Sequence, residues 1–361
     1  MSSRVNTAKW DEKRKYWRIV VQRDGITKNF TSSKPGRTGQ REANKKADDW
    51  LNGVTPTTRI RVEDAYKKYQ ESQFGLKSTS NDKDIESKGK IWILPYIGKR
   101  YLDTITIGDL QDIIDDAERQ GKSKKTMRNI RGRLTSFFKY CRKHGWVKLT
   151  TDDIEISEHA PVREKHILQS DALQVLFSVN TVKRRGVDKF DDYINAYRLQ
   201  VVSGLRPGEL LGLKWADIDD QAIHVQRAIN IYGETTRGKN DNAVRNIVLN
   251  DLMRQILHDQ KLLTRDCDYV FGNIHTEQNY LKRWHRYCES NGLPSLSVYE
   301  LRHTFVSITA AVLPEGAVKS IVGHSKSMDT FGIYGHDVNG DAEKSAQILE
   351  ERFVELIRET C

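Results

Sequence analysis

SGLRPGELLGLKW, the stretch from Ser203 to Trp215, carries the strongest local signal in this 361-residue chain. Arg206 stands directly before Pro207, and proline is favoured at the first position of a helix. Glu209 follows three residues after Arg206, close enough for its carboxylate to orient the guanidinium group. The stretch therefore predicts a short helix over 207–213 with an arginine at its start, where that arginine can bind a phosphate group.

Further motifs of the same chemical kind follow downstream. They are YELRHTF (Tyr299–Phe305), then GHS (Gly323–Ser325), and then TFGIY (Thr330–Tyr334). Taken singly, each arginine predicts a surface ion pair and each tyrosine predicts packing. Taken in order, two arginines, a histidine, a tyrosine and a nearby lysine suit metal-free cleavage of a phosphodiester. Guanidinium groups stabilise a phosphorane, and a tyrosine hydroxyl can attack phosphorus.

Other site chemistries find little support in the sequence. No GxxxxGK[ST] or GxGxxG motif is present, so we expect no nucleotide cofactor. His285, Cys288 and His303 do not have zinc-finger spacing. Acidic clusters such as Asp217–Asp220 are typical of solvated loops and helix caps, although a two-metal nuclease would need such groups. We therefore expect neither a metal nor a cofactor.

The rest of the carboxyl-terminal half is predicted to be helical around a small strand region. Strands are expected over 222–231 and 245–249, on either side of a polar turn at 234–242. A final helix is indicated by the apolar spacing from Ala346 to Ile357. The other predicted helices cover 172–177, 191–201, 252–262 and 280–291.

The middle of the chain predicts a helical domain with one strongly basic helix. Thr106–Asp109 has the pattern of a capping box, and an apolar stripe follows it towards Gly121. From Lys122 to Lys148 there are ten Lys and Arg residues and no acidic residue. A solvated helix face normally mixes signs, so this stripe predicts contact with DNA phosphates. The residues we assign to it are Lys122, Lys124, Lys125, Arg128, Arg131, Lys139 and Arg142.

The first sixty residues predict a small sheet with one helix. Polar and apolar residues alternate from Trp17, Asp24-Gly25 indicates a hairpin, and a helix is expected over 41–51. This segment holds 14 Lys and Arg against 6 Asp and Glu, within a chain of net charge +10. Such an excess favours a polyanionic partner, and we assign Arg18 and Lys28 to a second DNA contact.

These observations predict a mainly helical protein with small β-sheets (α+β) in three domains, over 1–55, 56–155 and 165–361. Its most apolar short stretch, Ile91–Ile97, is far below the roughly 20 residues of a membrane-spanning helix. No secretory signal opens the chain, and its four cysteines form no CxxC motif. We therefore expect a cytoplasmic protein without a membrane segment.

In order and spacing, SGLRPGELLGLKW, YELRHTF, IVGHS and TFGIYGH resemble the motifs of tyrosine recombinases, specifically phage and conjugative-transposon integrases. The resemblance implies cutting and rejoining of DNA at attachment sites through a 3′-phosphotyrosyl intermediate, so that a mobile element is integrated and excised in a bacterial host. It also implies that residues 1–55 bind arm-type DNA sites, that residues 56–155 bind the core site, and that residues 165–361 are catalytic.

The resemblance also implies roles for individual residues. Arg206 and Arg302 would bind the non-bridging oxygens of the scissile phosphate. Tyr334 would attack in line and release a 5′-hydroxyl, while His324 would donate a hydrogen bond to the phosphate.

Two assignments in this set are less direct. Lys239, six residues before Arg245, matches the family's β-hairpin lysine, which protonates the leaving oxygen; Lys214 is its rival. Tyr299 stands where the family commonly has histidine. A phenol can hydrogen-bond the phosphate or accept a proton, but with an ordinary pKa of about 10 it is a poorer base at neutral pH than imidazole. We therefore assign Tyr299 to the active site and leave both roles open.

The implied assembly is a homotetramer on double-stranded DNA attachment sites. We expect the final helix to dock on a neighbouring subunit; the alternative is that it docks on its own domain. Because every broken bond is conserved as a phosphotyrosine, direction must come from accessory partners, such as an excision factor or a host DNA-bending protein.

Three other functions remain in view at this point. A chromosome-resolving recombinase resembles the last two domains but usually lacks the first. A type IB topoisomerase would use similar tyrosine chemistry as a monomer without site preference. A non-catalytic DNA-binding protein would require a degenerate site, whereas the full residue set is present here.

Overall fold

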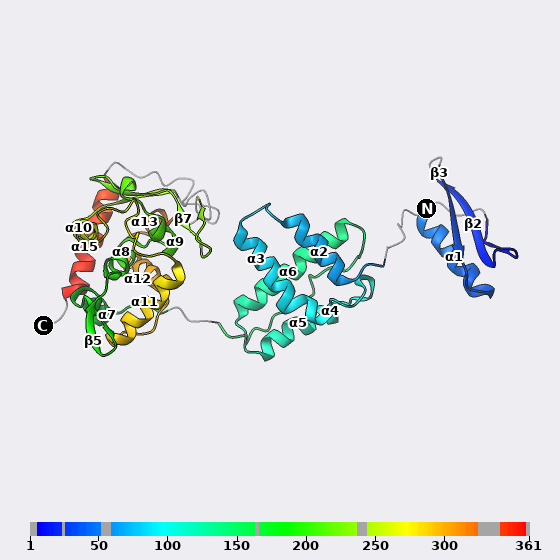
Figure 1. Cartoon of the computed structure of the whole chain (residues 1–361), viewed down its shortest axis with the longest axis horizontal. Helices are drawn as coiled ribbons and strands as arrows, with labels where there is room; N and C mark the ends of the chain where they lie inside the picture. The colour runs from blue at the N-terminus through cyan, green and yellow to red at the C-terminus, as the bar shows by residue number, and fades with distance from the viewer. Residues whose placement is uncertain are drawn as a thin grey trace. The chain divides into compact units, whose positions relative to one another are not determined.

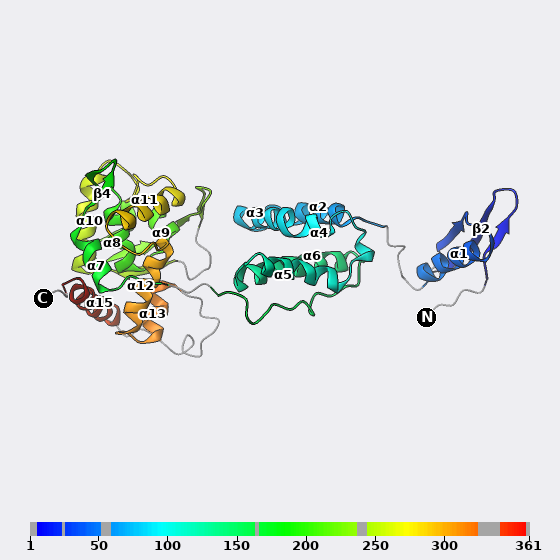
Figure 2. The ribbon, with the colours of Figure 1, turned by 90° about the horizontal axis from the view of Figure 1, so that it is seen from below.

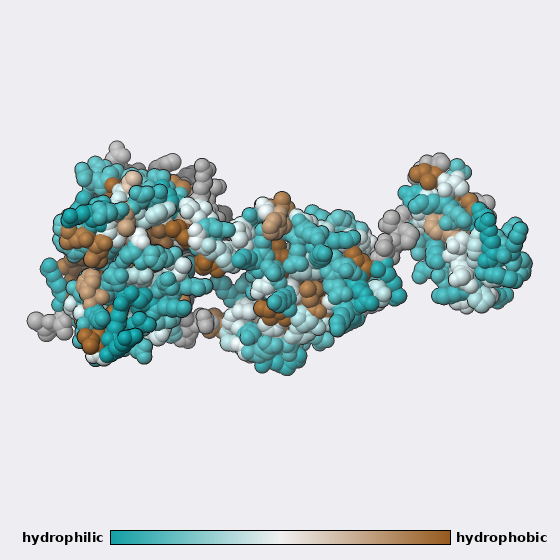
Figure 3. Space-filling model, in the orientation of Figure 1, coloured by the Kyte–Doolittle hydropathy of each residue, from teal (hydrophilic) through white to brown (hydrophobic). Residues whose placement is uncertain are grey.

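The computed structural model describes residues 6–23, 26–51, 59–162, 166–236, 244–323 and 340–358. The chain divides into two compact units, Met1–Arg163 and Glu164–Cys361. Helices predominate and the sheets are small (Figure 1), which confirms the mainly helical α+β class. The surface visible in Figure 3 is largely hydrophilic. Among these residues, no helix has the length and apolar character needed to cross a membrane.

The amino-terminal part of the first unit is a three-stranded antiparallel sheet with one helix against it. Ile19 and Val21 are buried against Ala43 and Ala47 of the helix, so the alternation from Trp17 is confirmed. The helix begins five residues earlier than expected, and the first strand was not predicted. The elements are β1 (Lys9–Asp11), β2 (Tyr16–Arg23), β3 (Ile26–Ser32) and α1 (Gly36–Leu51).

The remainder of the first unit is a bundle of helices with its own apolar cluster. In Figure 2 its helices form two layers, with α2, α3 and α4 in one and α5 and α6 in the other. The capping box at Thr106 and Asp109 is confirmed, as is the burial of the stripe that follows it. A π-helical turn, Gly89–Ile93, and a 3-10 turn, Leu102–Thr104, connect the helices. These are α2 (Val62–Gln73), α3 (Thr79–Lys88), α4 (Leu94–Ile97), α5 (Ile107–Arg119) and α6 (Lys124–Lys143).

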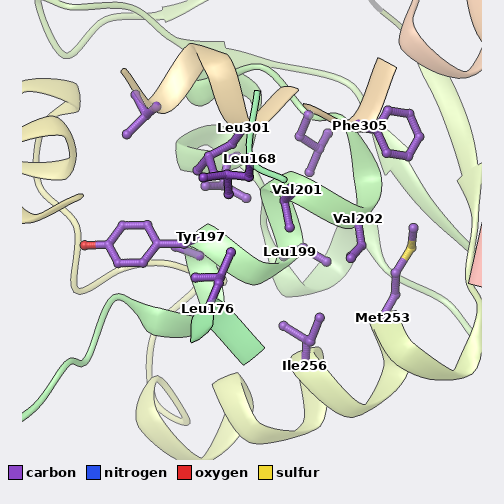
Figure 4. Packing of buried hydrophobic residues seen from close by; sticks show 14 of the residues in the cluster. Leu168, Leu176, Tyr197, Leu199, Val201, Val202, Met253, Ile256, Leu301 and Phe305 are labelled. Atoms are coloured by element: carbon purple, nitrogen blue, oxygen red, sulfur yellow. The ribbon is translucent and has the colours of Figure 1, made fainter. Parts of the chain in front are cut away.

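The second unit is built around α8 (Ile194–Ser203), which is buried along its whole length. Figure 4 shows Tyr197, Leu199 and Val202 of this helix among apolar side chains of α10 and α12. The other helices of the unit are α7 (Ser170–Ser178), α9 (Pro207–Gly212), α10 (Asp251–Leu263), α11 (Glu277–Ser290), α12 (Val298–Ala310), α13 (Glu315–Val322) and α15 (Asp341–Arg358).

Small antiparallel sheets lie at the edges of this helical core. The strand predicted over 222–231 is split in two: its first part pairs with β9 and its second part with β8. The β4–β5 hairpin was not predicted. A 3-10 turn, Trp215–Asp217, precedes β6. The strands are β4 (Thr181–Arg184), β5 (Val187–Phe190), β6 (Ala222–Val225), β7 (Ala228–Ile229), β8 (Thr235–Thr236) and β9 (Arg245–Val248).

The last helix, α15, packs on its own unit in this single chain. Phe353 is 1% exposed, and its ring stacks on that of Phe305 in α12 at 6.2 Å between centroids. Glu350 accepts hydrogen bonds from the backbone N–H groups of Asp251 and Leu252, where α10 begins. Docking on the same chain is the alternative that the sequence left open.

This packing predicts that Phe353→Ala will lower the free energy of unfolding of the isolated chain by about 3–5 kcal/mol, the usual cost of emptying an aromatic core site. Ile348→Ala on the same helix is the control, because Ile348 is 41% exposed. Denaturant melts of the monomer measure both variants. If Phe353→Ala unfolds like the wild type, α15 does not dock on its own domain.

Candidate active site

Arg206 and Glu209 form the first part of the site. Arg206 is the residue before α9, and its backbone N–H donates to Glu209 Oε2 at 2.9 Å. Its Nη1 donates to Glu209 Oε1 at 2.6 Å, and its Nη2 donates to the carbonyl of Gly323 at 3.2 Å. Glu209 therefore orients the guanidinium group of Arg206, as the sequence indicated.

Arg302 enters the same place from α12. Its Nη1 donates to the Gly204 carbonyl at 2.6 Å, and its Nη2 donates to the Val322 carbonyl at 2.7 Å. Gly204 ends α8 with a φ of +65°, and a Cβ there would lie 2.3 Å from the Phe305 ring. Glycine is thus required twice, by the left-handed backbone and by the close approach of α12. The turn fixes the carbonyl that holds Arg302.

Arg245, the first residue of β9, completes the charged cluster. Its Nη1 and Nη2 donate to the two carboxylate oxygens of Glu209 at 3.1 and 2.9 Å, and its Nε donates to the Ile321 carbonyl at 2.7 Å. Sequence reasoning used Arg245 only as a spacing marker for Lys239. No local signal identifies its role, because its partners lie 36 and 76 residues away.

Burial and neighbouring charges shift the pKa values of Arg302 and Glu209. Burial, together with the nearby Arg206 and Arg245, lowers the pKa of Arg302 to about 10, which still leaves it cationic at neutral pH. Burial alone would raise the pKa of Glu209, but hydrogen bonds from Arg245 and the charge of Arg206 hold that pKa below its ordinary value. The described part of the site therefore holds three cations and one anion.

Tyr299 lies one helical turn before Arg302 on α12. It is partly exposed, and its ring meets that of His303 edge-on at 5.3 Å. His303 therefore packs against Tyr299. Tyr299 and Arg302 therefore lie on the same helix, three residues apart.

Three of the predicted residues, Lys239, His324 and Tyr334, lie outside the described residues. Lys214, the rival of Lys239, has its ammonium 4.9 Å from the centroid of the Tyr269 ring. Within the portion of the chain with assigned positions, no three His, Cys, Asp or Glu side chains gather as a metal site would require.

The basic residues of α6 divide between two environments. Arg131 and Arg142 donate to the carbonyls of Ile154 and Leu149, at 3.2 and 2.7 Å, and so hold the loop that follows the helix. Lys124 approaches the carbonyl of Glu158 at 3.4 Å, and Lys122 is half-buried before the helix. The other exposed basic residues of α6, which pair with no described carboxylate, are Lys125, Arg128, Lys139 and Lys143.

Arg18 and Lys28 lie on opposite faces of the amino-terminal sheet. Lys28 pairs in register with Val21, which faces α1, and its ammonium lies 5.6 Å from the Trp50 ring centroid. Arg18 lies on the outer face and donates to Asn29 Oδ1 at 3.2 Å. The structure therefore does not bring these two cations together.

The carboxyl-terminal unit is similar to known integrases and recombinases. Residues 175–340 match the model of the phage integrase family. A XerC-like tyrosine recombinase of Caldanaerobacter subterraneus is 22% identical, over 94% of this chain and 97% of its own length. The ICEBs1 integrase of Bacillus subtilis is 21% identical over 43% of this chain and 48% of its own length.

Solved structures share the fold. The Tn1549 transposon integrase in complex with transposon right-end DNA has a TM-score of 0.62 and 21% identity, covering 82% of this chain and all of that one. The lambda integrase dimer bound to a core site has a TM-score of 0.58 and 16% identity, covering 94% of this chain and 98% of that one.

The paired charge of Glu209 predicts a pH-dependent stability. We expect Glu209→Gln to lower the free energy of unfolding at pH 7 by about 3–5 kcal/mol, the range for breaking a buried ion pair. Because the folded pKa is depressed, the contribution of Glu209 is present above its unfolded pKa of about 4.3 and is lost as the pH falls through the folded value. Denaturant melts should therefore show the wild type and Glu209→Gln converging at low pH.

The control is Glu277→Gln. Burial raises the pKa of Glu277, so its charged form destabilises the fold, and this variant should gain stability relative to the wild type as the pH rises. A Glu209→Gln deficit that is the same at pH 7 and pH 3 would contradict the assignment.

Proposed function

We propose that the chain is a tyrosine recombinase of the phage and conjugative-transposon integrase type, an enzyme that cleaves and rejoins DNA with a tyrosine nucleophile, and that it inserts and excises a mobile element through a 3′-phosphotyrosyl link. One observation carries this proposal. Arg206 and Arg302 converge on the carbonyls of Gly323 and Val322, directly before the segment whose sequence contains His324 and Tyr334.

The proposed reaction assigns one task to each residue. Arg206 and Arg302 bind the non-bridging oxygens and stabilise the charge that grows on the phosphorane. The phenol oxygen of Tyr334 bonds to phosphorus as the bond to the 5′ oxygen breaks, and Lys239 gives that oxygen its proton. His324 donates a hydrogen bond to the phosphate.

We assign Tyr299 to the same site, as a further group that hydrogen-bonds the phosphate. Support comes from its position one helical turn before Arg302 and from its partly exposed side chain. The reverse reaction, attack by a 5′-hydroxyl on the phosphotyrosine, rejoins the strand. No step requires a metal or a nucleotide.

We infer that α6 tracks the phosphates of the core site, as part of a core-binding domain over 56–155. Residues at spacings of three and four along α6 share one face of the helix. Four are basic and exposed, and the two in the middle are small, so a DNA backbone could approach closely. This face consists of Lys125, Arg128, Gly132, Ser136, Lys139 and Lys143.

A second DNA contact is proposed for the outer face of the amino-terminal sheet, as an arm-binding domain over 1–55. Arg18, Gln22 and Asn29 are exposed there, and their guanidinium and amide groups can bond phosphates or base edges. Lys28 lies on the other face of the sheet, beside Trp50. It would therefore contact a DNA phosphate and not the groove that Arg18 faces. Such a second site would let accessory proteins, an excision factor or a host DNA-bending protein, set the direction of recombination.

Assembly as a homotetramer on paired double-stranded attachment sites is proposed for the catalytic domain over 165–361, acting in the bacterial cytoplasm. A lambda integrase tetramer bound to a Holliday junction shares the fold, with a TM-score of 0.57 and 16% identity. We propose that α15 exchanges between neighbours and makes in the partner the contacts that it makes in the single chain.

Chromosome resolution is a second candidate, favoured by the XerC-like relative that matches 94% of this chain. A resolving recombinase would act between two copies of one chromosomal site. An integrase would join two different sites, so recombination of the element's ends with a separate target separates the two functions.

The central prediction concerns Tyr334. A nicked suicide substrate that carries the attachment site should form a covalent complex with the wild type in EDTA. Tyr334→Phe should form none, because the attacking oxygen is absent, and the complex is measured on denaturing gels. Tyr232→Phe, at another tyrosine of the same domain, is the control and should react normally. Metal-dependent cleavage would contradict the proposal, and equal cleavage of any duplex would favour a topoisomerase.

The α6 face predicts a change in salt dependence. Arg128→Ala and Lys139→Ala should each weaken DNA binding and reduce the slope of log K against log salt by about 1, because each removes one phosphate contact. Fluorescence anisotropy measures this slope between about 50 and 200 mM salt. Affinity that depends on phosphate contacts falls steeply over this range. Arg119→Ala is the control, since Arg119 pairs with Asp116 on α5. Unchanged slopes at both α6 positions would exclude this face.

A further inference from the structure

Arg245 is the one arginine of the charged cluster to which the proposed reaction gives no task. Its side chain is 7% exposed and that of Glu209 is 2% exposed, so the pair is almost fully removed from water. All three guanidinium nitrogens of Arg245 donate hydrogen bonds, two to Glu209 and one to Ile321. A buried arginine with this many fixed partners has little freedom to move towards a substrate.

The end of α13 shows what these bonds achieve. The last carbonyls of a helix have no partners within the helix. Here three successive carbonyls accept from three arginines: Ile321 from Arg245, Val322 from Arg302, and Gly323 from Arg206. Arg245 thus anchors the same helix end that contacts both phosphate-binding arginines, and residue 324 follows it directly.

Glu209 ties Arg245 to Arg206 more directly. Its Oε1 accepts from Nη1 of both arginines, at 2.6 Å from Arg206 and 3.1 Å from Arg245. With Arg245 present, the carboxylate is shared between two cations. Without it, the whole negative charge would act on Arg206 and compete with a phosphate for that guanidinium.

We propose that Arg245 is a positioning residue, which holds Glu209 and the last turn of α13 so that Arg206 and Arg302 are aligned on one phosphate. The inference rests on the proposed function, because it assumes that Arg206 binds the scissile phosphate. A lysine could not replace Arg245, since a single ammonium lacks the fork that reaches both carboxylate oxygens and a carbonyl.

The test compares Arg245→Met and Arg245→Lys with a matched control, Arg283→Met. Arg283 is also a largely buried arginine of the same unit, and it pairs with Asp191 and Asp192. Each folded variant is assayed for attachment-site binding and for single-turnover cleavage of the suicide substrate. A second substrate carries an uncharged methylphosphonate at the scissile position, where the charge of Arg206 matters less.

We expect both Arg245 variants to bind DNA within a few-fold of the wild type and to cleave the natural phosphate at least about 100-fold more slowly, the usual cost of a misplaced active-site group. The deficit should shrink on the methylphosphonate. Arg283→Met should lower the melting temperature without changing the ratio of the two rates. Wild-type cleavage by Arg245→Met, or an equal deficit on both substrates, would overturn the proposal.

Hydrogen exchange gives an answer that does not depend on activity. In Arg245→Met, the amides over 315–323 should exchange faster than in the wild type and in Arg283→Met. Unchanged exchange there would overturn the positioning role. If the wild-type protein formed no covalent complex with the suicide substrate, the proposed function itself would be contradicted.

Discussion

The buried carboxylate of Glu209 is the interaction on which the rest of the site depends. It lies between Arg206 and Arg245 and is almost fully removed from water. A charge in that position is tolerated only because both oxygens are bonded to cations. Arg302 then has to be held without a carboxylate of its own, and it relies on the carbonyls of Gly204 and Val322. The cluster therefore has an excess of positive charge. Such a cluster can stabilise the negative charge that a phosphodiester gains as it becomes a phosphorane.

This arrangement couples parts of the chain that are far apart in sequence. The two arginines proposed to bind the phosphate come from the start of α9 and the middle of α12, yet both donate to the end of α13. A disturbance at any one of these three elements must therefore reach the others. Gly204 shows how narrow the tolerance is, because α8 can end beneath α12 only where no Cβ is present. The apolar core that contains α8 also includes residues of α12, the helix that carries Arg302, and this packing supports the geometry of the site.

Local patterns in the sequence were sufficient for β2 and for several helices, including α5 and α6, whereas α3, α4, α12 and α13 were not predicted. The stripe of α6, the capping box at Thr106 and the alternation of Ile19 and Val21 each depend on neighbours a few residues away. In the site, the pairing of Arg206 with Glu209 was predictable for the same reason. Arg245 was not, because an arginine at the start of a strand has no local signature and its partners are distant. The β4–β5 hairpin was missed because all four residues of β5 are exposed, Val187 and Phe190 included, so this strand has no buried face to impose a pattern on the sequence.

The packing of α15 on its own unit affects how readily this helix could exchange between subunits. In the single chain this helix covers Phe305 with Phe353 and caps α10 with Glu350. If neighbours exchange the helix, each one makes the contacts that it gives up, so the exchange changes the contact energy little. The balance then depends on the local concentration of subunits. Under the proposed function, binding of several subunits to one DNA site raises that concentration, so DNA itself would favour the exchange of α15 between neighbours.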